Sequence, residues 1–143
     1  MPRLAVLNMA IGFGVLVLAA AAGAFIATDL TRAHLMDKEQ IASWALLLQS
    51  SAHGHTNLFA TVHICFALTL PYSVLPRRVK IWQTAGLSLG TFAMSIGMLV
   101  RSYLGPRAGI DPLELVIGVM LSCALAALAL HAYGLAAKLH RIR

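Results

Sequence analysis

Charged residues are scarce in this chain. Only 11% of its 143 residues are charged, whereas 59% are hydrophobic. Soluble domains are about one quarter charged, so this deficit argues against a soluble globular protein and predicts a membrane protein. None of the five acidic residues interrupts a long apolar run, and Glu114 lies only at the very start of the fourth predicted span. A proton-coupled transporter that relies on carboxylates at membrane depth is therefore poorly supported.

Cysteine and catalytic motifs are also scarce. Cys65 and Cys123 are far apart and form no CxxC or zinc pattern, so we interpret them as packing residues. The sequence has no GxSxG motif and no glycine-rich phosphate loop, which argues against a hydrolase or a transferase. The net charge of +6 fits the positive-inside rule, so we expect no nucleic-acid partner.

Long apolar runs are what the sequence has in abundance. Four runs predict membrane-spanning helices over residues 4–28, 52–75, 81–103 and 113–137, since about 20 helical residues cross the hydrocarbon core. Nothing remains for a soluble domain. We therefore predict one integral membrane domain over residues 1–143, with the all-α architecture of a four-helix transmembrane bundle in contact with the lipid bilayer.

The distribution of charge predicts how the spans are oriented. The two termini and the connection between spans 2 and 3 share one side, which carries Arg3, Arg77, Arg78, Lys80, Lys138, Arg141 and Arg143. The other side carries fewer basic residues and all five acidic ones. By the positive-inside rule, both termini are expected in the cytoplasm, in a bacterial-type inner membrane.

The connection between spans 1 and 2 is too long for a simple turn. Asp37 with Gln40 forms a capping-box pattern. Hydrophobic residues then follow at helical spacing, namely Ile41, Trp44, Ala45 and Leu48. This pattern predicts a short amphipathic helix on the outer membrane surface, with a plain structured loop as the alternative.

Histidines are the ionisable groups of span 2, and such groups at membrane depth usually serve function. His53 and His55 are about 200° apart on a helix and point to nearly opposite sides. His55 and His63 are about 12 Å apart along the axis. No two of these three can therefore readily bind one metal ion from the same helix. Each can instead be an interfacial or packed histidine.

A haem held by span 2 needs a second axial ligand from elsewhere. His131 lies much deeper than His55, near 27 Å from the outer surface at about 1.5 Å per residue. The remaining candidates are His53, His34, Met98 and a second copy of the chain. A homodimer facing span 2 across a two-fold axis would supply matching ligands at one depth.

Two arginines lie at the level of the outer histidines. Arg101 and Arg107 follow the outer end of span 3, where their guanidinium groups can pair with haem propionates. The alternative is an ordinary set of basic residues at the membrane interface.

One segment resembles a known family. His55-Thr56-Asn57-Leu58, followed by Pro71-Tyr72-Ser73-Val74-Leu75-Pro76, is similar to the second helix of subunit I in the haem–copper oxidase superfamily. The likeness is to the nitric oxide reductase and C-type oxidase branches. It covers the region of that one helix, and it implies that His55 is an axial ligand of haem b. The later helices that carry the family's copper ligands and second haem ligands have no visible equivalent, so a complete oxidase or reductase is not expected.

Three functions follow as hypotheses. The first is a small haem b protein for electron transfer or diatomic gas binding, with His55 as ligand and His63 or His53 as the next candidate. The second is a copper-handling or other metal-handling protein that uses His55, His63 and Met98, because thioether and imidazole ligands suit copper. The third is a cofactor-free accessory subunit of a larger respiratory membrane complex. Whether any reaction is catalysed stays open.

Overall fold

The computed structural model describes residues 3–35, 43–105, 109 and 111–142, and all its regular elements are helices. The long helices are α1 (Arg3–Leu35), α2 (Ser43–Thr69), α3 (Arg77–Phe92) and α5 (Pro112–Ile142). A short 3-10 helix, η1 (Leu70–Tyr72), ends α2. The π-helical turn η2 (Ala93–Gly97) joins α3 to α4 (Met98–Leu104). The predicted all-α class is confirmed for these residues.

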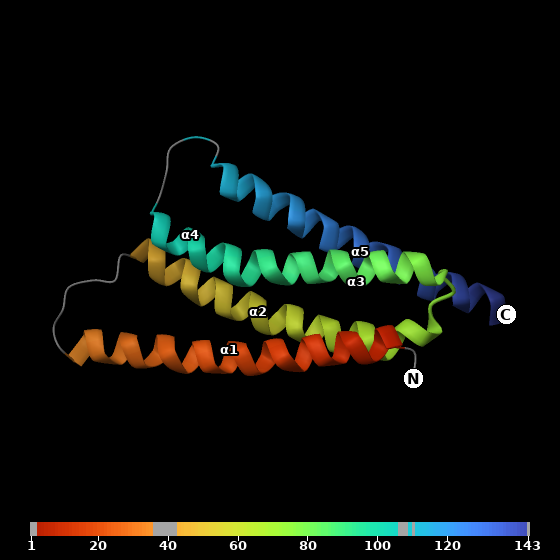
Figure 1. Ribbon diagram of the computed structural model, residues 1–143, viewed down its shortest axis with the longest axis horizontal. Coiled ribbons are helices and arrows are strands. Elements are labelled where there is room, and N and C mark those ends of the chain that lie inside the picture. The colour runs from red at the N-terminus through yellow and green to blue at the C-terminus, as the bar shows by residue number, and fades with distance from the viewer. Residues whose placement is uncertain (1–2, 36–42, 106–108, 110, 143) are drawn as a thin grey trace.

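The helices run antiparallel, with α2 and α3 between the outer helices α1 and α5 (Figure 1). Both termini and the connection between α2 and α3 lie at one end, which we call the terminal end (Figure 1). The last turns of α1 and α4 and the first turns of α2 and α5 lie at the opposite end, which we call the loop end (Figure 1). Along the bundle α1 packs on α2, α5 packs on α3, and α2 faces α3, η2 and α4.

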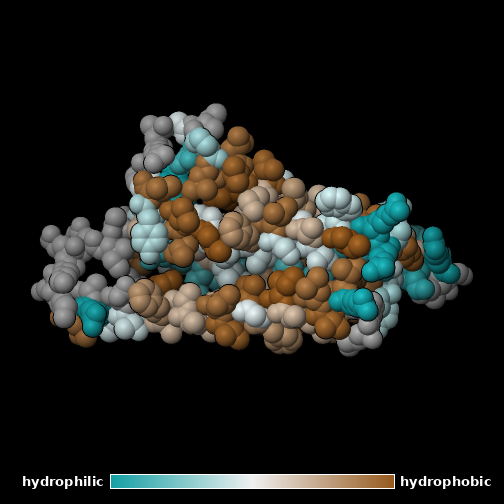
Figure 2. All heavy atoms as spheres, viewed as in Figure 1, coloured by the Kyte–Doolittle hydropathy of each residue, from teal (hydrophilic) through white to brown (hydrophobic). Residues whose placement is uncertain are grey.

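Within the described part of the chain, three stretches are long and apolar enough to cross a membrane: Arg3–Thr28, Arg77–Leu104 and Pro112–Arg141. In α1 and α5 only 11% of the most apolar window is buried in the protein, against 50% in the α3–α4 stretch. Large exposed apolar side chains of the outer helices, such as Phe13 and Leu115, colour much of the visible surface hydrophobic (Figure 2). These features fit a protein embedded in lipid, where an apolar exterior is favourable.

The segment after residue 42 differs from the prediction. Trp44, Ala45 and Leu48 belong to the first turns of α2 and run into it without a break, so they do not form a separate surface helix. Asp37, Gln40 and Ile41 lie outside the described residues. A continuous helix satisfies the backbone hydrogen bonds of these residues, whereas a break before Ser50 would leave helix ends to be capped.

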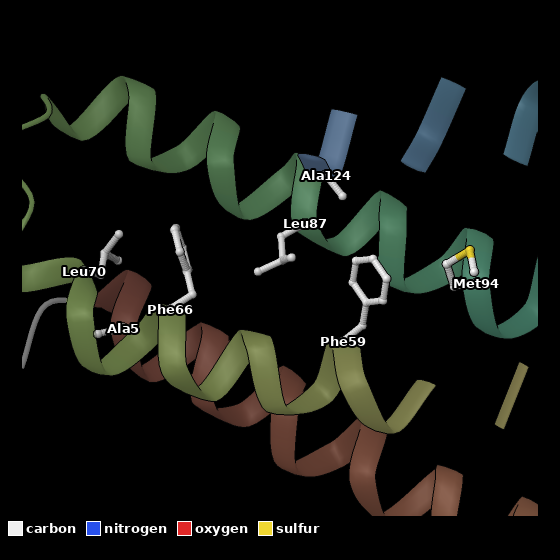
Figure 3. Close-up of a cluster of buried hydrophobic side chains, with 7 residues drawn as sticks. All are labelled: Ala5, Phe59, Phe66, Leu70, Leu87, Met94 and Ala124. Atoms are coloured by element: carbon white, nitrogen blue, oxygen red, sulfur yellow. The ribbon is translucent and has the colours of Figure 1, made fainter. Parts of the chain in front are cut away.

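Small residues allow the helices to approach closely. A Cβ atom at Gly86 would lie 2.9 Å from the carbonyl oxygen of Cys123, and one at Gly12 would lie 2.8 Å from that of Ala60. Small residues at the contacts between membrane helices commonly allow such close approach of their backbones. The core between the helices is filled by a buried apolar cluster (Figure 3): Ala5, Phe59, Phe66, Leu70, Leu87, Met94 and Ala124.

Candidate functional site

Polar side chains are grouped on α2 and on the sides of α1 and α3 that face it. Hydroxyl groups of α2 donate to carbonyls one turn earlier, as Thr56 does to Ala52 at 2.6 Å and Thr61 does to Asn57 at 3.0 Å. Such hydrogen bonds satisfy hydroxyl donors without solvent. The histidines of α2 are the groups left to interact with other helices or ligands.

His55 is held by its own helix. Its Nδ1 atom lies 2.8 Å from the carbonyl oxygen of Ser51 and 3.2 Å from the Ser51 hydroxyl. Because a carbonyl oxygen only accepts, Nδ1 carries the proton and Nε2 keeps a free lone pair. The structure gives Nε2 no hydrogen-bond partner among the described residues. A backbone carbonyl that fixes the ring through Nδ1 is a common feature of metal-binding histidines.

His53 faces α1, opposite to His55. Its Nε2 atom accepts a hydrogen bond from the amide of Asn57 at 3.2 Å. Its Nδ1 atom is buried without a hydrogen-bond partner in the part of the chain that is described. The ring lies on Gly23, where an added Cβ would come within 2.6 Å of the ring carbon Cε1. The opposite placement predicted for His53 and His55 agrees with these separate contacts.

A groove of about 370 Å³ opens beside His53 between α1, α2 and the α3–α4 stretch. Its α1 wall is aliphatic and includes Val15 and Leu18. The opposite wall carries the polar residues Gln49, His53, Thr56, Ser88, Thr91 and Ser95. Ser95 belongs to the π-helical turn, and such turns are frequent at functional sites. Phe92, Ile96 and Leu99 also line that side, so the groove is mainly apolar and offers a few polar groups to a membrane-soluble ligand.

His63 is fully buried at the centre of a polar network that joins three helices. Its Nδ1 atom lies 2.9 Å from Oδ1 of Asn8 on α1, and its Nε2 atom lies 3.2 Å from the hydroxyl of Thr91 on α3. The Asn8 amide nitrogen donates to the carbonyl of Leu4 at 2.8 Å and to the hydroxyl of Thr84 at 3.0 Å. The Asn8 oxygen therefore accepts the proton of His63 Nδ1.

Both ring nitrogens of His63 thus lie within hydrogen-bond distance of protein groups, although the Thr91 hydroxyl, whose single proton could go to Nε2, also lies 2.9 Å from the carbonyl of Leu87. A haem or metal ion could use His63 only after the hydrogen bond to Asn8 or to Thr91 is broken. In this arrangement His63 links helices, which corresponds to the packed-histidine alternative, although its partners are side chains and not a backbone carbonyl. His63 and His55 do not meet at one site.

Arg101 is buried and engaged by neighbouring groups. Its Nη2 lies 2.8 Å from Oε1 of Glu114, and its Nε lies 3.5 Å from Oδ2 of Asp111. Its Nη1 donates to the carbonyl of Gly105, and its guanidinium carbon lies 5.1 Å from the ring centroid of Trp44. A haem propionate would have to displace these carboxylates. Arg107 lies outside the described residues.

The proposed sulfur ligand lies within the apolar interior. Met94 is buried in the core cluster, and Met98 packs against it. Among the described residues no three His, Cys, Asp or Glu side chains come together as a metal site. His55 and His63 have separate contacts, His55 within α2 and His63 with α1 and α3, so they do not converge on Met98 as one copper site.

His131 forms a second interhelical contact near the terminal end. Its Nε2 lies 2.8 Å from the Thr69 hydroxyl of α2, and its ring lies 4.5 Å from that of Phe66. The Thr69 hydroxyl also donates to the carbonyl of Cys65 at 2.8 Å, so it accepts the proton of His131. We interpret His131 as a structural residue.

Sequence reasoning missed the partners of His63. Asn8 was passed over although it is the one amide side chain in the apolar run of α1, and that isolation was an available signal. Thr84 and Thr91 gave no such signal, because threonine is common in membrane helices. Comparison with known proteins adds no assignment: no family model, curated protein or solved structure matches the chain.

Proposed function

We propose that this protein is a small integral membrane protein that binds haem b through His55 and serves in electron transfer or diatomic gas binding. The observation that carries the proposal is the state of the His55 ring. Its Nδ1 proton is fixed on the carbonyl of Ser51, which leaves the Nε2 lone pair available as a ligand. The sequence resemblance around His55 supports the same assignment.

His55 would supply one haem ligand from each chain. His55 lies one turn before Leu58, at the edge of an exposed stripe of α2 made of Gly54, Leu58, Thr61, Cys65 and Leu68. A second copy that approaches this stripe would bring its own His55 to the same depth. Without that second ligand, one axial position of the iron would stay open. Haem would supply the redox or gas-binding chemistry, while the chain positions the imidazole.

We also propose that α2 crosses the membrane, to give four spans with both termini in the cytoplasm of a bacterial-type inner membrane. Helix α2 is not among the three stretches that are apolar enough by themselves to cross a membrane, but it runs beside α3 and packs against α1 along its length (Figure 1). The fully buried His63 of α2 is paired with side chains of α1 and α3 inside the protein. The cationic residues of the terminal end favour the cytoplasmic side.

An alternative function is a cofactor-free accessory subunit of a larger membrane complex. One observation favours it: His63 is satisfied by Asn8 and Thr91 and needs no cofactor to explain its burial. The exposed apolar faces of α1 and α5 would then contact partner subunits as well as lipid. A copper-handling role has less support, because the described residues assemble no ligand cluster.

Absorption spectra test the haem proposal. The protein would be produced with ample haem, purified in detergent, and recorded oxidised and dithionite-reduced. We expect a Soret band that is lost in His55→Ala and kept in His140→Ala, a control on the exposed last turn of α5. Circular dichroism establishes that each variant keeps its helices. Absence of a Soret band in the wild-type protein would refute haem binding, and loss in His53→Ala alone would refute the assignment to His55.

A further inference from the structure

A cavity of about 380 Å³ lies at the terminal end, between the starts of α1 and α3 and the end of α2. Three of its six lining residues are cationic: Arg3, Arg77 and Lys80. The other three, Leu4, Leu70 and Pro71, give it an apolar side. We call it the basic pocket. The visible surface of the terminal end is markedly hydrophilic, in contrast to the middle of the bundle (Figure 2).

The cations of the basic pocket have no nearby countercharge. The chain has no acidic residue in residues 1–28, 40–110 or 115–143. Of the remaining acids, Asp111 and Glu114 lie beside Arg101 at the loop end. No ion pair or hydrogen bond of the Arg3 or Arg77 side chain occurs among the described residues. The only ion pairs there belong to Arg101, at the opposite end. The positive charge of the pocket is therefore left uncompensated by the described protein.

Lys80 is fixed at the wall of the pocket. Its Nζ atom donates to the carbonyls of Leu70 at 3.0 Å and of Ser73 at 2.8 Å. An ammonium group has three donors, so one remains for a ligand. Helix α3 begins at Arg77 without a side-chain cap, and its first backbone N–H groups add positive potential there. The pocket thus combines one anchored cation with two mobile ones.

We propose that the basic pocket binds the phosphate group of an anionic phospholipid. Arg3, Arg77 and the free donor of Lys80 would contact the phosphate, while the apolar side of the pocket would contact the glycerol and the first acyl carbons. Basic pockets between membrane helices on the cytoplasmic side recognise anionic head groups. A lipid is the favoured source of the phosphate because the pocket has both cationic and apolar walls and lies at the end of membrane helices. This site is independent of haem.

Native mass spectrometry of delipidated protein in detergent tests the site. Phosphatidylglycerol, phosphatidylcholine and inorganic phosphate would be titrated separately, and the bound fraction counted. The informative variant is Arg3→Gln/Arg77→Gln. Neither side chain has a hydrogen bond or an ion pair with the described protein that its loss would break. Lys80 stays unchanged, because it also holds two carbonyls of the chain.

The matched control is Lys138→Gln/Arg141→Gln. These cations are exposed in the last turns of α5, at the same end, and do not line the pocket. Both variants remove two positive charges from the terminal end. A diffuse surface potential would therefore be lowered equally by both, whereas a built site would respond to the first alone.

We expect phosphatidylglycerol to bind more tightly than phosphatidylcholine, and Arg3→Gln/Arg77→Gln to weaken phosphatidylglycerol binding about tenfold. The control should change it less than about twofold. Equal weakening in both variants would overturn the pocket in favour of diffuse attraction. Equal affinity for the two lipids would overturn selection of an anionic head group. Displacement of phosphatidylglycerol by millimolar inorganic phosphate would overturn the lipid as the source of the phosphate.

Discussion

Asn8 and His63 contact each other in the interior of the bundle, with the Oδ1 atom of Asn8 2.9 Å from the Nδ1 atom of His63 and both side chains fully buried. The pair connects α1 to α2, and Thr91 and Thr84 extend the contact to α3. A buried polar network of this kind stabilises a structure only when its members are paired.

The first prediction concerns this pair. Asn8→Leu leaves His63 Nδ1 buried without a partner, and we expect a loss of about 1–3 kcal/mol in unfolding free energy. The double variant Asn8→Leu/His63→Leu should lose less than the sum of the two single variants, because both polar partners are removed together. Unfolding in detergent, followed by circular dichroism, measures each value.

Asn57→Leu is the control for that experiment. Asn57 is also a helix amide paired with a histidine, but it and His53 are only partly buried. Its loss should therefore cost less than the loss of Asn8. A variant Asn8→Leu as stable as the wild type, with additive effects in the double variant, would contradict a stabilising network.

The second prediction concerns the contact of α3 with α5. A Cβ atom at Gly90 would meet the Cβ of Ala124 and would lie 2.9 Å from Cε1 of Phe59. Gly90→Ala should therefore destabilise the protein by about 1–3 kcal/mol, as other overpacking substitutions do. The control is Gly14→Ala, where nothing lies within 4 Å of the added atom. Thermal unfolding of both variants in one detergent gives the comparison, and equal melting temperatures would refute the close contact.

The third prediction concerns Arg101. Arg101→Gln leaves Asp111 buried without its cation, and breaking a buried ion pair costs about 3–5 kcal/mol. Because the Glu114 side chain is 50% exposed, we expect the lower part of that range. Arg78→Gln, an exposed residue of α3, should change stability by less than about 0.5 kcal/mol. The unfolding free energies of the two variants, measured against the wild type, test this prediction. Equal losses of unfolding free energy in both variants would show that the Arg101 ion pairs contribute little to stability.

The fourth prediction concerns topology. With Cys65 and Cys123 replaced by serine, single cysteines at positions 78 and 109 are exposed to a membrane-impermeant maleimide in intact cells. Four spans with both termini inside predict labelling at position 109 alone, and labelling at position 78 only after permeabilisation. If α2 does not cross, the connection before α3 lies outside and the pattern reverses. That reversed pattern would leave three spans.

Helix content followed from the sequence because it depends on local chemistry. Low charge and long apolar runs require helices that satisfy their own backbone hydrogen bonds in lipid. The ends of the helices were less accurate: α1 continues to Leu35, beyond the predicted residue 28. Hydropathy indicates where the chain passes from lipid into water, whereas a helix can continue beyond that boundary. The same limitation made the start of α2 look like a separate surface helix.

The candidate site was only partly accessible from sequence. The helical repeat alone placed His53 and His55 on opposite sides of α2, and the structure agrees. Whether the ring nitrogens of each histidine are hydrogen-bonded depends on tertiary contacts. His63 is satisfied by Asn8, which is 55 positions away, and Arg101 is paired with Glu114 of another helix. No local pattern encodes such partners.

The sequence by itself determined that the chain is helical and membrane-embedded, and that three of its six histidines share one helix, because these properties follow from composition and a fixed helical repeat. The tertiary structure decided which of these groups remain available. Packing joined α1, α2 and α3 around His63 and gathered Arg3, Arg77 and Lys80 at one cavity. The reason is physical: a hydrogen bond or an ion pair forms between groups that the fold brings within a few ångströms, whatever their separation along the chain.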